Sequence, residues 1–153
     1  MASAVVTIQN DELSALCSRL NAAALSDKDR NQLLTDIGVE LETQVQERFH
    51  TKMSPDGDKW KDLADSTALY YQKKFGSKNP FNGLLWRNSS VPLRDTIMSE
   101  TEGLSVIVGA TKIYAAVHQW GYKKIPPRPY LGLGTGDKTE IMGIIERFLS
   151  ARI

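Results

Sequence analysis

The side chains that could carry out catalysis or hold a metal ion are few in this sequence and lie far apart. The chain has two histidines, His50 and His118, and one cysteine, Cys17. None of the three lies at metal-ligand spacing from another, so zinc is not predicted. His118 could serve as a general base, but the neighbouring sequence places no serine or cysteine nucleophile beside it. We therefore predict no catalytic and no metal-binding residues, and keep a small hydrolase-like enzyme that uses His118 as an alternative.

Two short patterns could bind a cofactor or a cation, and both have the wrong spacing. Gly132 and Gly134 precede a predicted helix, whose free N–H groups would attract a phosphate. Asp137 follows where a dinucleotide fingerprint requires Gly or Ala, and it puts negative charge where the phosphate would lie. The acidic turn at residues 56–62 lacks the EF-hand spacing and its bidentate Glu. We predict no nucleotide, no calcium and no other cofactor.

The composition is that of a soluble, single-domain globular protein. The chain has 153 residues, of which 41% are hydrophobic and 24% charged, and its formal net charge is +1. This length supports one domain, residues 1–153, with a core of its own. No apolar run approaches the roughly 20 residues that span a bilayer, and the first residues lack the pattern of a secretory signal. We therefore expect no membrane contact and a location in a cytoplasm.

The charge also bears on nucleic acid as a partner. A protein that neutralises many phosphates needs a pronounced basic footprint, and a net charge of +1 does not supply one. Lys73 and Lys74 follow Tyr70 and Tyr71 in a segment that could be a short helix or mobile, and we interpret them as a solvated face. The charge leaves room for a local nucleic-acid contact but does not indicate one.

Residues 113–134, IYAAVHQWGYKKIPPRPYLGLG, combine two aromatic clusters, a proline-rich rod and glycines in one short stretch. The pattern from Tyr114 to Trp120 predicts a short helix that ends at Trp120, because Gly121 favours a left-handed terminating conformation. The prolines at 126, 127 and 129 then hold Arg128 on a stiff, extended segment. Its guanidinium could bind a carboxylate of a neighbouring chain or a phosphate. The alternative is a surface loop whose prolines only separate two elements.

Three helices are predicted to position this stretch. The longest runs from about residue 29 to 51, on the apolar stripe Leu34, Ile37, Leu41, Val45 and Phe49, after hydrogen-bond acceptors at residues 26–29. Gly38 inside it predicts close packing. An earlier helix, preceded by a short strand at residues 5–8, carries Leu13, Leu16, Cys17, Leu20 and Ala24. A last helix begins where Asp137 acts as cap and Glu140 completes a capping box.

A hairpin completes the predicted fold. Residues 91–99 and 104–110 are the strand candidates, joined by a polar loop that ends at Gly103. In the second strand Leu104, Val106, Val108 and Ala110 share one face, which should be core. Asp95 interrupts the alternation of the first strand, so that strand is expected at an edge or partly in an interface. The fold class is α+β: N-terminal helices and a C-terminal helix packed on a small antiparallel sheet.

Three motifs in sequence resemble the phage virion morphogenesis family, which includes tail-completion proteins of contractile-tailed phages and related prophages. They are Pro-Asp-Gly-Asp-Lys-Trp at residues 55–60, Tyr-Ala-Ala-Val-His-Gln-Trp-Gly at 114–121, and Ile-Pro-Pro-Arg-Pro-Tyr-Leu-Gly at 125–132. Each is weak alone, but the three in this order are specific. The resemblance extends from Phe49 to the last helix and leaves residues 1–28 outside it. It departs from the family pattern at residues 88–90, where a Gly-Leu pair is expected.

The resemblance implies a structural α+β protein, with no catalysis and no cofactor, that completes the tail and enables head–tail joining as a ring. Its partners would be copies of itself and other phage tail and head–neck proteins, in the host cytoplasm during assembly and then in the virion tail. We hypothesise that residues 113–134, with Trp60 behind them, form or support the subunit interface, through Trp60, Tyr114, His118, Trp120, Arg128, Pro129 and Tyr130. These side chains could instead form a local core, with the interface on the strand edge. A DNA-contacting neck protein is the other alternative.

Overall fold

The computed structural model describes residues 14–15, 18–19, 25–76 and 91–152. The predicted strand at residues 5–8 and the apolar positions of the first predicted helix lie outside these residues, although residues 14, 15, 18 and 19 are helical. The described elements are α2 (Asp27–Thr51), α3 (Asp65–Phe75), the 3₁₀ helix η2 (Leu93–Thr96), β1 (Ile97–Glu102), β2 (Ser105–Ala110), α4 (Ala115–Trp120) and α5 (Thr135–Ser150).

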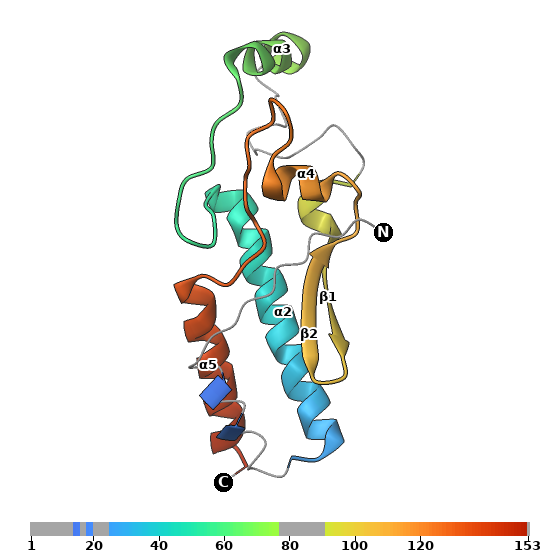
Figure 1. Ribbon diagram of the computed structural model, residues 1–153, viewed down its shortest axis with the longest axis vertical. Coiled ribbons are helices and arrows are strands. Elements are labelled where there is room, and N and C mark those ends of the chain that lie inside the picture. The colour runs from blue at the N-terminus through green and yellow to red at the C-terminus, as the bar shows by residue number, and fades with distance from the viewer. Residues whose placement is uncertain (1–13, 16–17, 20–24, 77–90, 153) are drawn as a thin grey trace.

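The long helix α2 is the central element, with the β1–β2 hairpin along one side and α5 along the other (Figure 1). It begins two residues earlier than predicted, because Ser26 is the N-cap and its Oγ accepts a hydrogen bond from the Asp29 N–H at 3.2 Å. It ends at Thr51, and the C-cap residue Lys52 adopts a left-handed conformation with a φ of 59°. The helix predicted from the apolar stripe is confirmed.

Buried residues of α2 contribute to two separate hydrophobic clusters. Val45 and Phe49 pack in the cluster near α4 and the hairpin, with Trp60, Leu93, Ile97, Ala110, Ala115, Tyr130 and Leu131. Leu33 packs in the other cluster, against the stripe of α5 formed by Ile141, Ile145 and Leu149. The two-stranded antiparallel sheet packs on α2, and α5 also packs on α2, so the predicted α+β class is confirmed.

The hairpin differs from the prediction at its first strand. β1 begins at Ile97 and continues through Glu102, so residues predicted as a loop belong to the strand, and residues 93–96 form η2 instead. The Thr96 hydroxyl donates to the Leu93 carbonyl at 2.7 Å, which stabilises that turn. A 3₁₀ turn also explains why Asp95 breaks the strand alternation. The hairpin turn is tight, because Gly103 adopts a φ of +58°.

Close packing at Gly38 is confirmed, because a Cβ there would lie 3.1 Å from the Ser99 Oγ on β1. The Glu42 carboxylate holds the same strand residue by accepting from its N–H at 3.1 Å and its hydroxyl at 3.2 Å. The face predicted for the second strand is partly wrong: Ala110 is buried, but Leu104 lies in the turn and is 69% exposed. A turn residue has no neighbouring strand or helix to cover it.

The helix α3 lies at the end of the molecule opposite the C-terminus (Figure 1). The structure shows it as a helix of 11 residues, which is one of the two states predicted for this segment, and none of its residues is buried. Pro55 and the Asp-Gly pair at residues 56–57 predict a tight turn after α2, which is confirmed, since the Ser54 N–H donates to the Asp58 carbonyl at 2.7 Å and Gly57 adopts a φ of +90°. The sequence Gly-Ser-Lys-Asn-Pro at residues 76–80 also predicts a flexible loop, and residues 77–80 of it lie outside the described residues.

Candidate interaction site

Residues 113–134 fold back on themselves as one unit. The helix α4 ends at Trp120, as predicted, and Gly121 follows with a φ of +78°, where a Cβ would lie 3.0 Å from the Ile125 carbonyl oxygen. Tyr122 and Ile125 close the turn by exchanging two backbone hydrogen bonds, at 3.0 and 2.9 Å. The chain then returns beside α4, where the Arg128 N–H donates to the His118 carbonyl at 2.7 Å.

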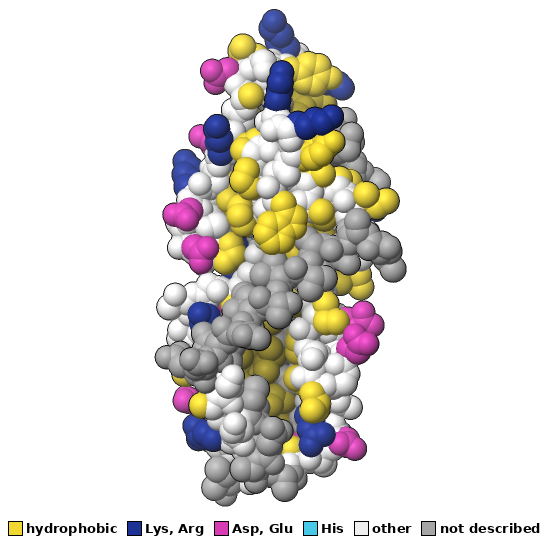
Figure 2. Space-filling model, in the orientation of Figure 1, with side chains coloured by type: hydrophobic (Ala, Val, Ile, Leu, Met, Phe, Trp, Pro, Cys, Tyr) yellow, Lys and Arg dark blue, Asp and Glu magenta, His cyan; other side chains and the backbone are white. Residues whose placement is uncertain are grey.

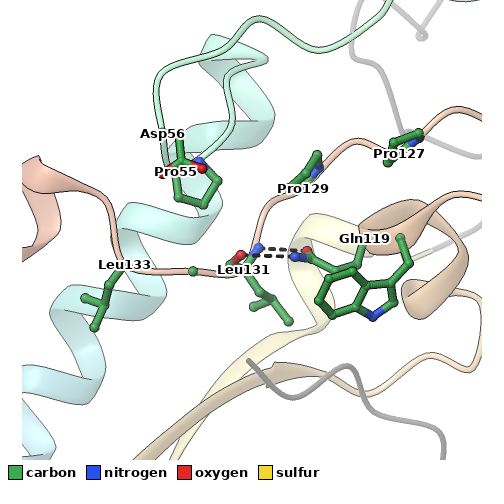
Figure 3. Close-up of a pocket in the computed structure, with 9 residues that line it drawn as sticks. Pro55, Asp56, Gln119, Pro127, Pro129, Leu131 and Leu133 are labelled. Atoms are coloured by element: carbon green, nitrogen blue, oxygen red, sulfur yellow. Dashed lines mark hydrogen bonds between the residues drawn. The ribbon is translucent and has the colours of Figure 1, made fainter. Parts of the chain in front are cut away.

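The side chain of Gln119 holds the segment that returns beside α4, at Tyr130 and Leu131, against this helix (Figure 3). Its Oε1 accepts from the Tyr130 N–H at 3.0 Å and the Leu131 N–H at 2.9 Å, while its Nε2 donates to the Leu131 carbonyl at 3.0 Å. The Tyr130 hydroxyl donates to the Ala115 carbonyl at 3.0 Å. Burial raises the pKa of Tyr130, so this phenol stays protonated and remains a donor. The N–H groups of Tyr130 and Leu131 and the carbonyl of Leu131, which belong to no helix or strand, are thus bonded by a side chain.

Arg128 and Trp60 connect this unit to the chain before α3. Arg128 is only 5% exposed, and it donates from Nε to the Lys61 carbonyl at 2.8 Å and from Nη2 to the Asp62 carbonyl at 3.1 Å. Burial lowers the pKa of its guanidinium, and the nearby Asp62 charge opposes this shift. The Trp60 indole N–H donates to the Pro129 carbonyl at 2.8 Å, and its ring meets Phe49 edge to face.

Arg48 of α2 binds the other end of the same unit, and the sequence analysis missed it. Its Nη1 donates to the Tyr130 carbonyl at 2.7 Å and the Gly132 carbonyl at 3.0 Å. Its Nη2 pairs with the Asp137 carboxylate, and both side chains are buried. A signal was present, because Arg48 follows the buried Val45 by three residues and therefore lies near the apolar face of the helix.

The start of α5 corrects the predicted capping pattern. The N-cap is Gly134, and Asp137 is the third helical residue, whose carboxylate accepts from the Gly134 N–H at 2.7 Å. Glu140 therefore takes no part in a capping box. Asp137 is buried because it also pairs with Arg48, which a local pattern does not reveal. The turn at Pro55 packs on this segment so closely that a Cβ at Gly132 would lie 2.9 Å from the Pro55 Cγ, and one at Gly134 would overlap the Pro55 carbonyl.

An open pocket of about 370 Å³ lies where these segments meet (Figure 3). Its lining is mostly apolar and stiff, and consists of Pro55, Asp56, Gln119, Trp120, Pro127, Pro129, Leu131, Gly132 and Leu133. Trp120, which lines the pocket, is 61% exposed, and Tyr122, two residues further along the chain, is 57% exposed. Hydrophobic side chains gather over this part of the molecule, with basic side chains towards the α3 end (Figure 2).

The structure brings the seven residues of the interface hypothesis into one region but at different depths. Trp60, Arg128 and Tyr130 are buried within the chain, and their polar atoms bond to its own backbone. Tyr114, His118 and Pro129 are half-buried, and the rings of Tyr114 and His118 meet edge to face at 6.2 Å. Trp120 is the member of this set with a largely exposed side chain. The buried three can support a contact surface, and Trp120 can form one.

Two searches of the described residues bear on other kinds of site. Among residues 14–15, 18–19, 25–76 and 91–152, no three side chains of His, Cys, Asp or Glu lie together in a way that could hold a metal ion. In the same part of the chain, no helix has the length and apolar character needed to cross a membrane.

Comparisons with known proteins connect this arrangement to phage assembly. The chain is 26% identical over 122 residues to the Mu-like prophage FluMu G protein 1 of Haemophilus influenzae. The aligned region covers 80% of this chain and 81% of that protein. It is 29% identical over 129 residues to the putative capsid assembly protein G of Escherichia phage Mu, covering 76% of this chain and 78% of that protein. An uncharacterized protein of Methanocaldococcus jannaschii, MJ0331, is 29% identical over 105 residues, covering 67% and 76%.

No solved structure matches this chain significantly. The model of the phage virion morphogenesis family matches residues 11–150, so the match includes most of the segment at 1–28 that the three motifs leave outside the resemblance. Nearly the whole chain is therefore covered by one family, and the protein belongs to the phage virion morphogenesis family.

Proposed function

We propose that this protein is a structural component that completes the phage tail and enables the head and tail to join, as a ring of identical subunits. The family match over residues 11–150 carries this proposal. The name of the phage Mu relative refers to capsid assembly, and a component of the head–tail joint would contact the capsid as well as the tail. The protein would act without a catalytic step, first in the host cytoplasm and then in the virion tail.

The geometry around α4 supports a role in protein contacts. Hydrogen bonds of Gln119, Arg128 and Arg48 connect the irregular, proline-rich segment to α4, to the chain before α3 and to α2. The surface of this segment therefore loses little conformational entropy when a partner binds. Exposed aromatic rings beside a rigid pocket are typical of the centres of protein interfaces. We propose that the surface around Trp120 contacts a neighbouring subunit, while Trp60, Arg128 and Tyr130 support it from inside.

Deletion of this gene from the phage or prophage that carries it tests the proposed function. We expect induced cells to accumulate filled heads and separate tails, and infectious particles to fall by at least about a thousandfold, because neither half completes the joint. Expression of the protein from a plasmid should restore joined particles, as counted by electron microscopy. Complete particles in the deletion strain, or the loss of heads alone, would refute the proposal.

A further inference from the structure

The outer face of the hairpin is an exposed apolar surface with negative charge. Met98, Glu100 and Glu102 alternate along β1 and so point to one side, away from the face that packs on α2. Met98 is 60% exposed, and Ile107, which pairs with Glu100, is 41% exposed. Residues 97–110 contain two acidic and no basic side chains. We call Met98, Glu100, Glu102 and Ile107, together with the exposed turn residue Leu104 at the tip of the hairpin, the hairpin face.

A second exposed apolar surface carries the opposite charge. Trp120, Tyr122 and Ile125 are 61%, 57% and 40% exposed around the α4 turn, and Lys123 and Lys124 between them are exposed too. Residues 111–136 contain no Asp or Glu. We call Trp120, Tyr122, Lys123, Lys124 and Ile125 the turn face. The acidic Asp56 lies across the pocket from Pro127, on the side away from this turn (Figure 3).

The two faces lie apart on the same molecule. The hairpin turn lies near the first turns of α2, whereas α4 lies beyond the last turns of that helix, towards α3 (Figure 1). The faces are different patches, so a contact between them joins subunits head to tail. Such a contact closes into a ring when its rotation allows. Matching apolar surfaces with opposite charges would fix the register of that contact and disfavour hairpin-to-hairpin pairing.

We propose that the occupant of the turn face is a second copy of this chain, which docks there by its hairpin face. Met98, Leu104 and Ile107 pack against Trp120, Tyr122 and Ile125, while Glu100 and Glu102 pair with Lys123 and Lys124. The proposal rests on the ring of the proposed function and names its contact. The interface is then formed by the hairpin face of one subunit and the turn face of the next.

Charge reversal on each face tests this contact. Variant A carries Glu100→Lys and Glu102→Lys, and variant B carries Lys123→Glu and Lys124→Glu. Like charges then face each other in A–A and B–B contacts, so we expect each variant alone to associate at least about a hundredfold more weakly than the unchanged chain. In a mixture, every A–B contact again joins opposite charges. Assembly should therefore return when A and B are combined in equal amounts.

Sedimentation velocity on the purified full chains measures these outcomes, with circular dichroism to show that both variants are folded. The control Glu140→Lys with Glu146→Lys reverses two exposed charges on α5 and should assemble normally. Normal assembly of A or B alone overturns the contact but leaves the ring in place. A mixture that stays unassembled also overturns the contact. An unchanged chain that stays monomeric at all concentrations overturns both the contact and ring formation by the protein alone, while the deletion phenotype still tests the role in head–tail joining.

Discussion

Replacing Arg48 by methionine is expected to lower the free energy of unfolding by about 3–5 kcal/mol, because it leaves the buried Asp137 carboxylate without its partner. The same change removes the donor to the buried Tyr130 carbonyl and to the half-buried Gly132 carbonyl. Methionine is shorter than arginine but keeps an unbranched apolar stem, so the effect reports mainly on the lost charge and hydrogen bonds of the guanidinium. Urea unfolding at 25 °C, followed by tryptophan fluorescence, measures it.

Two further variants make this prediction specific. Adding Asp137→Asn to Arg48→Met removes the uncompensated charge, and we expect the double variant to be more stable than Arg48→Met alone. Arg30→Met removes an exposed ion pair with Asp27 and should cost less than about 1 kcal/mol. The account of the buried pair would be wrong if Arg48→Met and Arg30→Met had equal effects.

Replacing Gln119 by leucine is expected to lower the free energy of unfolding by about 3 kcal/mol or more. The change leaves three buried backbone groups unpaired, the N–H groups of Tyr130 and Leu131 and the carbonyl of Leu131, and each costs roughly 1–3 kcal/mol when unsatisfied. Hydrogen exchange gives the sharper readout, because the amides of residues 130 and 131 should exchange much faster while those of α2 change less.

The matched control for this prediction is Gln32→Leu. Gln32 donates to Asp36 on the exposed side of α2, and the loss of that contact should leave both stability and the exchange of residues 130 and 131 nearly unchanged. Unaltered protection of the Tyr130 and Leu131 amides in Gln119→Leu would show that something other than this side chain holds the segment to α4.

The sequence predicted those helices and strands that are determined by patterns of neighbouring residues. The apolar stripe predicted α2, Gly121 predicted the end of α4, and alternation predicted β2, because each pattern reflects one element buried against its neighbours. The start of the first strand was wrong because residues 93–96 turn as a 3₁₀ helix, a choice that a hydroxyl of Thr96 helps to make. Alternation alone does not distinguish an edge strand from such a turn.

The bonding of the candidate site was not predictable from local sequence. The prolines around Arg128 predicted a stiff, extended segment, whereas the partners of its guanidinium are carbonyls 66 and 67 residues earlier in the chain. Arg48 and Asp137 are separated by 89 residues, so no local pattern connects them. The capping pattern correctly placed Asp137 at the start of the last helix. Its position as third helical residue and its pairing with Arg48 were not predicted.

Locating the protein in the particle tests the proposed role at the head–tail joint most directly. Phage can be assembled with a tagged copy of this chain, labelled with gold-conjugated antibody and imaged by electron microscopy. We predict that the label lies at the junction of head and tail in joined particles, and at one end of tails that have not met a head. Labels distributed over the capsid shell, or absent from finished particles, would contradict this role.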